Sequence, residues 1–194
     1  MIAGLILAGG ESKRMATPKA LLKLGEETFV DHICNEMKVA GIRLISVITG
    51  PHHEQISEAL KSHWEISITH NSQYQKGQVS SLQMGLRHLP TGSTAALVWP
   101  VDHPLVKTET VSLLLSQFKE AKQHLTIPVH NSHRGHPVIY DLHAIRSVLS
   151  FGPDQTAKAL QSIYAGQITF VNVEDEGVIK DIDTPEDYRK YVGS

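Results

Sequence analysis

An uninterrupted apolar run, Ile2–Ala8, stops abruptly at the pair Gly9-Gly10. Because no polar residues alternate with the apolar ones, the run predicts a strand that is buried on both faces, as in a parallel sheet. The two glycines leave the backbone N–H groups at the end of this strand open to close approach. A hydroxyl and three cations follow within a short stretch: Ser12, Lys13, Arg14 and Lys19. Amide donors and positive charges around a bare backbone are what a polyphosphate needs, so this stretch predicts a phosphate site.

Strand and helix patterns alternate along the rest of the chain. Further strands are predicted at 44–49, 66–69, 95–101, 125–129 and 168–173, and one begins after residue 137. Helices are predicted at 28–40, 54–63, 108–122 and 156–164, one more ends near residue 88, and the last begins at Thr184. In a chain of 194 residues, this alternation of strands and helices predicts one α/β domain over residues 1–194. We expect a doubly wound, mostly parallel sheet with helices on both faces.

The overall composition excludes several classes of protein. The formal net charge of −2 argues against broad attraction to nucleic acid or to an anionic membrane. The apolar runs are too short to span a bilayer, and the N-terminus reads as the first strand rather than a signal peptide, so we expect a cytoplasmic protein. The single cysteine, Cys34, excludes an intrachain disulfide and lies in a helix-like stretch, which favours a buried, inert thiol.

The glycine-rich segment differs from two familiar phosphate-binding loops, because it contains neither G-x-x-x-x-G-K-S/T nor G-x-G-x-x-G. It resembles the signature L-A-A/G-G-x-S-x-R-M-G-x-x-K of the small nucleotidyltransferases, with Ala16 in place of the last glycine. The alternative interpretation is an ordinary turn with a solvated basic face. The resemblance implies a set of nucleotide-binding residues here: Leu7, Ala8, Gly9, Gly10, Ser12, Arg14 and Lys19.

A second polar segment follows the predicted strand at 66–69 and runs into a helix. Local capping of that helix by Gln78, Ser80 or Ser81 would explain part of it. The segment also resembles N-x-x-x-x-x-G-x-x-x-S-L of the nucleotidyltransferases, which lines the base and ribose pocket. On that resemblance the further nucleotide-binding residues are Asn71, Gly77, Ser80, Ser81 and Leu82.

Asp102 ends the predicted strand at 95–101, and Pro104 follows it closely. Asp102 is not needed as a helix cap, since the next helix is predicted to begin only at Thr108. A carboxylate at the end of a buried strand is a natural metal ligand, because ligands gather at the carboxyl ends of parallel strands. The resemblance to the family's D-x-P motif implies that Asp102 holds the catalytic Mg²⁺.

A cluster of acidic residues precedes the last predicted helix. Thr184 as N-cap, Pro185 at the first helical position and Asp187 three residues past the cap form a complete helix start without any function. Asp181 and Asp183 are left over, and an extended segment would put both on one side. The resemblance to N/D-x-N/D-T-P-E-D implies that Asp183 is the second metal ligand, with Asp181 a further candidate. Without metal, we expect the carboxylates of Asp102 and Asp183 to repel each other.

The segment Arg134-Gly135-His136-Pro137 has two interpretations. By itself it predicts a tight turn that enters a strand. It also resembles the R-G-H-P segment of the molybdenum-cofactor branch of the nucleotidyltransferases, which implies that Arg134, Gly135 and His136 lie near the acceptor. His130, His133 and His136 recur every third residue, but the turn residues around them disfavour a zinc site.

In all, the resemblance runs from Ile2 to Tyr188 and identifies the chain as similar to the MobA-like NTP transferases, most of all to molybdenum cofactor cytidylyltransferases. It implies an Mg²⁺-dependent transfer of a nucleotide, with CTP favoured, to a phosphate-bearing acceptor of the molybdopterin type. The expected catalytic residues are Arg14, Lys19 and Asp102. Docking to a molybdoenzyme or its chaperone is a further expectation. Glycine at the position of Gly9 is more usual in the guanylyl-transferring relatives. The sequence therefore does not decide whether the donor nucleotide is CTP or GTP.

Three alternatives remain at this point. Within the same reaction class, the acceptor could be a sugar or alditol phosphate. A nucleotide-binding oxidoreductase is disfavoured, because no acidic residue follows a G-x-G-x-x-G turn to hold a ribose. A binding protein without turnover is also disfavoured, since the expected charged residues Arg14, Lys19, Asp102 and Asp183 are all present.

Overall fold

Strand β1 (Ile2–Ala8) lies in the middle of the main sheet, paired in parallel with β6 (Ala95–Pro100) and with β4 (Ile45–Thr49). The computed structural model describes residues 1–152 and 154–193. Within them the strand order of this sheet is β10-β7-β9-β6-β1-β4-β5, with β8 beside β7. The remaining strands are β5 (Ile66–His70), β7 (Leu125–His130), β8 (His133–Arg134), β9 (Val138–Asp141) and β10 (Ile168–Asn172).

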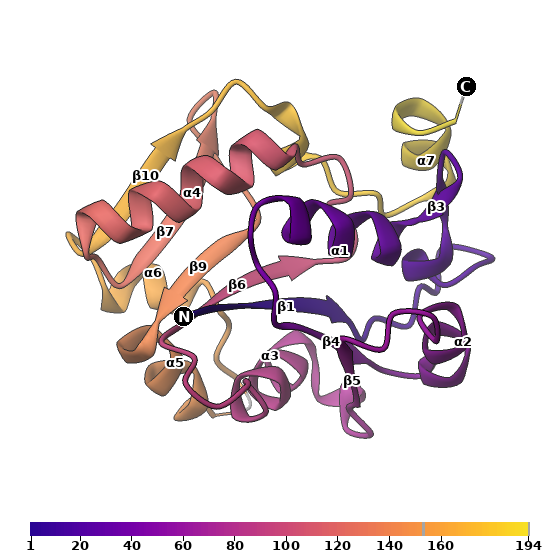
Figure 1. The fold of residues 1–194 in the computed structure, drawn as a ribbon, viewed down its shortest axis with the longest axis horizontal. Coiled ribbons are helices and arrows are strands. Elements are labelled where there is room, and N and C mark those ends of the chain that lie inside the picture. Colours follow the sequence, from indigo (N-terminus) through magenta and orange to yellow (C-terminus); the bar gives the residue numbers. More distant parts are fainter. Residues whose placement is uncertain (153, 194) are drawn as a thin grey trace.

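Helices cover both faces of this sheet, as the sequence predicts. Figure 1 shows α1 (Phe29–Val39) and α4 (Thr108–Ala121) on one face, with α3 (Gln78–Arg87) and α5 (Leu142–Leu149) on the other. The remaining α-helices are α2 (His53–Ala59), α6 (Ala159–Ile163) and α7 (Pro185–Tyr191). Three short 3-10 helices complete the set: η1 (Lys19–Leu21), η2 (Tyr74–Lys76) and η3 (Glu176–Ile179). The prediction of a mostly parallel, doubly wound α/β fold is confirmed.

The sequence patterns missed three features of this arrangement. Strand β9 runs antiparallel between β6 and β7, so the sheet is mixed on that side. Helix α5 follows β9 directly, with Asp141 as a side-chain N-cap. A separate hairpin joins β2 (Lys23–Leu24) to β3 (Glu27–Thr28). All three are short elements, whose periodicity is weaker than that of the central strands.

Two apolar clusters, one on each face, hold the helices to the sheet. Strand β1 contributes to both, with Ile6 in one cluster and Leu5 in the other, because successive side chains of a strand point to opposite faces. Cys34 is fully buried, and this burial raises the pKa of its thiol to about 12. The thiol is therefore neutral and inert, as expected.

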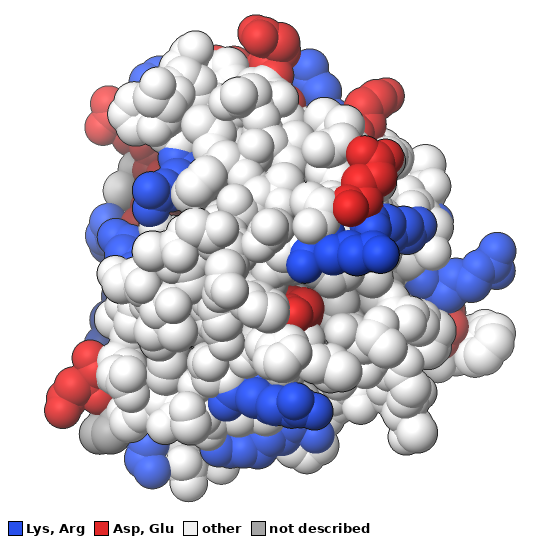
Figure 2. Space-filling view, turned by 90° about the vertical axis from the view of Figure 1, so that its left-hand side faces the viewer, with Lys and Arg blue, Asp and Glu red and all other residues white. Residues whose placement is uncertain are grey.

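The ends of the central strands are fixed in register by pairing. Leu7 lies opposite Pro100, and Ala8 lies opposite Thr49. The segments that follow β1, β4 and β6 therefore leave the sheet at one edge, where ligands of such folds gather. On the outer face drawn in Figure 2, side chains of both charges are scattered without one continuous basic patch. No helix in the described part of the chain has the length and apolar character needed to cross a membrane.

Candidate active site

A cavity of about 580 Å³ opens at this edge of the sheet. It is lined by most of the residues that the sequence singles out: Leu7, Ala8, Gly9, Gly10, Ser12, Arg14, Lys19, Gly77, Ser81, Asp102 and Asp183. Seven other candidates do not line it: Asn71, Ser80, Leu82, Arg134, Gly135, His136 and Asp181. The structure thus brings together segments from both ends of the chain in one cavity.

The loop after β1 is shaped by Ser12. Ser12 has a left-handed backbone, with φ of 50°, and its hydroxyl accepts a hydrogen bond of 3.0 Å from the backbone N–H of Lys19. Its carbonyl accepts another of 2.8 Å from the N–H of Met15. Ala16, where the family motif has glycine, does not require a positive φ. The serine hydroxyl therefore closes the loop and places Lys19 at the start of η1.

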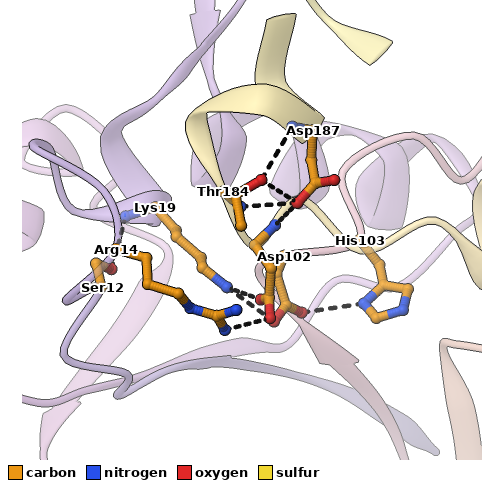
Figure 3. A network of polar contacts seen from close by, with 8 residues as sticks. Ser12, Arg14, Lys19, Asp102, His103, Thr184 and Asp187 are labelled. Atoms are coloured by element: carbon orange, nitrogen blue, oxygen red, sulfur yellow. Dashed lines mark hydrogen bonds and ion pairs between the residues drawn. The ribbon is translucent and has the colours of Figure 1, made fainter. Parts of the chain in front are cut away.

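Lys19 and two aspartates meet inside the cavity (Figure 3). The Nζ atom of Lys19 lies 3.4 Å from Oδ2 of Asp102 and also donates to Oδ1 of Asp183. From the mouth of the cavity, Arg14 donates to Oδ2 of Asp183 at 2.5 Å. The side chain of Lys19 is only 16% exposed, whereas that of Arg14 is 65% exposed. Arg14 is therefore open to solvent, whereas Lys19 is largely buried.

Asp183 is held in the cavity by the start of α7. The carboxylate of Asp187 accepts hydrogen bonds from the backbone N–H groups of Asp183 and Thr184, at 3.1 and 2.8 Å. Thr184 completes a capping box with Asp187, so the predicted helix start is confirmed. One residue earlier, the N–H of Ile182 donates to the carbonyl of Asp102 at 2.8 Å. This bond ties the C-terminal segment directly to the end of β6.

Both carboxylates are stabilised in their ionised form. Burial raises the pKa of Asp102, but the hydrogen bond and charge of His103, with the charges of Lys19 and His136, outweigh it and lower this pKa to about 2. The pKa of Asp183 is also lowered, first by its hydrogen bond from Lys19. The structure thus corrects the expectation that the two carboxylates repel each other without metal. An ammonium group lies between them and offsets the repulsion.

Asp181 does not join this group. Its side chain is exposed, and Ile182 beside it is fully buried. Asp183 lines the cavity, and its N–H donates to the carboxylate of Asp187, whereas Asp181 is not among the lining residues. The structure gives Asp181 no place in the cavity.

The second predicted nucleotide segment divides into lining and supporting residues. Asn71 is buried, and its side-chain amide donates to the hydroxyls of Ser80 and Ser81, at 2.9 and 3.0 Å. Gly77, with φ of 92°, is the N-cap of α3 without a side-chain cap. The alternative interpretation, a side-chain cap for this helix, does not hold, and the hydroxyl of Ser80 donates to the carbonyl of Gly77. Asn71 and Ser80 support the wall that Ser81 forms.

Gly9 and Ser81 face each other across this wall. A Cβ atom added at Gly9 would lie 2.6 Å from the hydroxyl oxygen of Ser81, which is too close for an unstrained contact. Gly10, by contrast, has open space around it. The glycine at position 9 is thus required by its neighbour, whereas Gly10 leaves its backbone open toward the cavity.

The Arg134–His136 segment lies beside a second cavity of about 840 Å³, which shares Leu7, Gln78 and Pro100 with the first. Gly135 packs against the backbone of Val178, where a Cβ would meet the carbonyl oxygen at 2.3 Å. The N–H of His136 donates to the same carbonyl. The tight turn itself lies a few residues earlier than the sequence predicts, at Asn131 and Ser132, which both have positive φ, and the segment bends at His136 before β9 begins at Val138. Leu82 also lines the second cavity.

The sequence missed several residues at the first cavity. His103 does not line the cavity, but its Nδ1 atom donates to Oδ1 of Asp102, 3.0 Å away, and its ring packs edge-on against that of His136. The lining residues that the sequence did not single out include Glu11, Pro18, His52, Tyr74, Gln75 and Gln78. Two sequence neighbours could have pointed to these residues. His103 directly follows Asp102, and Gln78 directly follows Gly77.

The carboxylate oxygens of Asp102 and Asp183 are of the kind that could hold a divalent cation. Because Asp102 and Asp183 contact one nitrogen of Lys19, their nearest oxygens are at most about 7 Å apart, twice the longest hydrogen-bond distance. Modest side-chain movement would bring both within reach of one Mg²⁺, which takes few protein carboxylates and completes its shell with water and phosphate oxygens. Across residues 1–152 and 154–193, no group of three or more histidine, cysteine or acidic side chains is placed to hold a metal.

Known proteins share this fold and parts of this sequence. The chain is 25% identical over 185 residues to the molybdenum cofactor cytidylyltransferase of Escherichia coli, covering 95% of this chain and 92% of the relative. It is 32% identical over 117 residues to a probable molybdenum cofactor guanylyltransferase of Bacillus mycoides, covering 59% of this chain and only 56% of the relative.

Solved structures of similar fold include a nucleotidyl transferase from Methanothermobacter, at a TM-score of 0.84 and 20% identity, covering 99% of this chain and 96% of that one. Another is the manganese complex of Rv0371c from Mycobacterium tuberculosis, at a TM-score of 0.80 and 18% identity, covering 100% and 98%. At these identities they show the fold alone. The model of the MobA-like NTP transferase domain, however, matches residues 4–168. The chain therefore belongs to the MobA-like NTP transferase family.

Proposed function

We propose that this nucleotidyltransferase moves a nucleoside monophosphate, with CTP as the favoured donor, to molybdopterin or a related phosphate-bearing cofactor. One observation carries the proposal: Lys19, Arg14, Asp102 and Asp183 meet at a cavity that also exposes the backbone of Gly10. Cations and amides for a triphosphate, and carboxylates for a metal ion, are the groups that such a transfer needs.

The proposed step is a single displacement at phosphorus. A phosphate oxygen of the acceptor forms a bond to the α-phosphorus of the triphosphate, and the bond from that phosphorus to the α–β bridging oxygen breaks. Pyrophosphate leaves with the electron pair. Since a phosphate monoester has its second pKa near about 6, it is a nucleophile at neutral pH and needs no general base.

The chain's own residues would align the two polyanions and neutralise the charge on the leaving pyrophosphate. Arg14, at the exposed mouth, would bind the β- and γ-phosphates together with the amides of the Gly9–Ser12 loop. Lys19, deeper in the cavity, would reach the α-phosphate or the acceptor. Both cations contact Asp183, so they would exchange a carboxylate partner for a phosphate.

Asp102 and Asp183 are the residues that would hold Mg²⁺. When bound, the ion would act as a template for the phosphates and as a Lewis acid. The lowered pKa values of both carboxyl groups support this role, because a metal ligand has to be ionised. Manganese in a structure of similar fold also supports the use of a divalent metal.

The choice of CTP rests on the relative that spans nearly the whole chain, the cytidylyltransferase of Escherichia coli, and on the sequence motifs at 134–137 and 181–187. Gly9 and the shorter match to the Bacillus mycoides guanylyltransferase favour GTP. A guanylyltransferase acting on the same cofactor is therefore the second candidate. In either case we propose a cytoplasmic enzyme of one domain, and docking to a molybdoenzyme stays a prediction.

Isothermal titration of CTP, GTP and ATP in the presence of Mg²⁺ tests the donor, and pyrophosphate release with the molybdenum cofactor tests the reaction. We expect CTP to bind most tightly and to release pyrophosphate only when the acceptor is present. Tighter binding of GTP would move the protein to the guanylyl branch. Absence of pyrophosphate release with any triphosphate would contradict the proposed reaction.

A further inference from the structure

The two oxygens of the Asp102 carboxylate have different partners. Oδ1 lies 3.0 Å from the Nδ1 atom of His103, and Oδ2 lies 3.4 Å from the Nζ atom of Lys19 (Figure 3). Asp102 is ionised at neutral pH, and an ionised carboxylate only accepts hydrogen bonds, so the proton of the bond to His103 lies on Nδ1. One oxygen is thus held by an imidazole outside the cavity, and the other faces the ammonium inside it.

His103 is itself fixed in place. Its backbone N–H donates to the carbonyl of Pro100 at 3.2 Å, and its carbonyl accepts a hydrogen bond of 2.9 Å from the indole N–H of Trp99, which is fully buried on β6. The imidazole packs edge-on against the ring of His136, with 4.8 Å between the ring centres, and the His103 side chain is only 13% exposed. A donor held in this way can set the orientation of the carboxylate beside it.

Lys19 is not a lasting partner for this carboxylate. In the proposed reaction its ammonium exchanges a carboxylate for a phosphate, so the contact with Oδ2 is lost when the nucleotide binds. The bond from His103 to Oδ1 remains, because His103 lines neither cavity and does not meet the substrates there. A carboxylate that binds a metal is commonly oriented by a further hydrogen-bonding group, and removing such a group weakens metal binding or activity by about 10–100-fold.

We propose that His103 is a positioning residue, whose Nδ1–H group holds Oδ1 of Asp102 so that Oδ2 stays turned toward the place of Lys19, where the metal ion would bind. The inference rests on the proposed function, because it takes Asp102 as a metal ligand. With Oδ1 engaged by His103, the carboxylate offers the ion a single oxygen. This suits Mg²⁺, which takes few carboxylate oxygens from a protein and completes its shell with water and phosphate oxygens.

The test compares His103→Leu with His103→Asn. Leucine fills a similar volume without a donor, whereas asparagine puts an amide nitrogen at the place of Nδ1, because both nitrogens are bonded to Cγ. The bonds to Pro100 and Trp99 come from backbone atoms of His103, so they survive either substitution. His124→Leu is the matched control, since the Nδ1 atom of His124 lies 2.8 Å from a carboxylate oxygen of Asp141 and neither residue lines a cavity.

The measurement is binding without transfer. Isothermal titration gives the Kd of an α,β-methylene triphosphate, that of CTP or of GTP, whichever binds more tightly, once with Mg²⁺ and once with EDTA. The Kd with EDTA divided by the Kd with Mg²⁺ reports what the metal adds to binding, and a general loosening of the fold would raise both values alike. We expect His103→Leu to lower this ratio about tenfold, with the Kd in EDTA unchanged. His103→Asn should keep most of the ratio, and His124→Leu should match the wild type.

Three results would overturn the inference: an unchanged ratio in His103→Leu, an equal loss in His103→Asn or in His124→Leu, and a wild type that binds the analogue equally well with Mg²⁺ and with EDTA. If the ratios change as expected but no triphosphate yields pyrophosphate with the molybdenum cofactor, the proposed function fails and the inference stands. Should His103→Leu not unfold cooperatively, His103→Gln takes its place, because its amide nitrogen lies one bond farther from the backbone than Nδ1 and misses Oδ1.

Discussion

The Nζ atom of Lys19 lies 3.4 Å from the carboxylate of Asp102, although 83 residues separate them in the chain. The same nitrogen contacts Asp183, which comes from the C-terminal segment. Two ionised carboxylates so close together need a cation between them, and here a side chain supplies it. Lys19 thus holds the place that a divalent ion would take between these two groups when a nucleotide is bound.

Replacing Lys19 by methionine should make the protein more responsive to Mg²⁺. Methionine keeps a long apolar stem but leaves Asp102 and Asp183 without the ammonium, so in the absence of metal the variant should lose about 1–3 kcal/mol of unfolding free energy. Thermal unfolding with and without Mg²⁺ measures the effect, with Lys61→Met at an exposed ion pair as control. We expect Mg²⁺ to raise Tm more in Lys19→Met than in the wild type. An equal rise in all three proteins would refute a shared site.

Arg14→Ala should slow catalysis without unfolding the protein. The side chain is 65% exposed, so its loss should change the stability little, whereas its proposed contact to the leaving phosphates is made in the transition state. We expect a hundredfold or larger decrease in kcat/KM, about 2.7 kcal/mol. Steady-state pyrophosphate release measures it, and Arg43→Ala, at an exposed position outside the cavity, should behave like the wild type. A near wild-type rate in Arg14→Ala would remove this residue from the phosphate site.

Asp102→Asn should change how stability depends on pH. The folded-state pKa of Asp102 is about 2, below its unfolded value of about 3.9. The carboxylate therefore adds stability that is fully present above about pH 4 and is lost as the pH falls toward 2. The difference amounts to about 2 kcal/mol.

Urea unfolding of wild type and Asp102→Asn between pH 2 and 7 tests this linkage. The wild type should be more stable than the variant above about pH 4, and the two should converge toward pH 2. This differs from the sequence-based expectation that the carboxylates of Asp102 and Asp183 repel each other, because repulsion would make the removal of one charge stabilising. A constant difference at every pH would show that Asp102 does not gain its stabilisation through ionisation.

Gly9→Ala should be tolerated only if Ser81 also changes. The new methyl group would lie 2.6 Å from the hydroxyl oxygen of Ser81 but 3.5 Å from its Cβ, so the clash comes from the hydroxyl. Gly9→Ala alone should cost about 1–3 kcal/mol, and Ser81→Ala in the same protein should restore most of this loss. A double-mutant cycle of unfolding free energies measures the coupling. Equal effects of Gly9→Ala in both backgrounds would show that the wall adapts without strain.

The sequence predicted the architecture and much of the first cavity, because these depend on strong local signals. The run Ile2–Ala8 is apolar throughout, and Gly9-Gly10 follows it without a transition. The capping residues around Thr184 fix the start of α7. From these patterns and the family motifs, the prediction that Asp102 and Asp183 approach the same place could be made before any coordinates.

The sequence could not predict contacts that depend on the packing of distant segments. Lys19 as the bridge between two carboxylates requires the bond from Ile182 to Asp102, which has no sequence signature. The place of Tyr140 in the wall of the second cavity follows from the antiparallel placement of β9 between β6 and β7. Asp181 was a further candidate for the metal site because of its spacing from Asp183, but it is exposed and does not line the cavity.

The most direct test of the central claim follows the α-phosphorus itself. CTP labelled with radioactive phosphorus at the α-position is incubated with Mg²⁺, molybdenum cofactor and either wild type or Asp102→Asn. The account predicts that the wild type transfers the label to the acceptor and releases unlabelled pyrophosphate, and that Asp102→Asn transfers none. Label that stays in CTP or appears only as free CMP with the wild type would contradict nucleotidyl transfer to this acceptor.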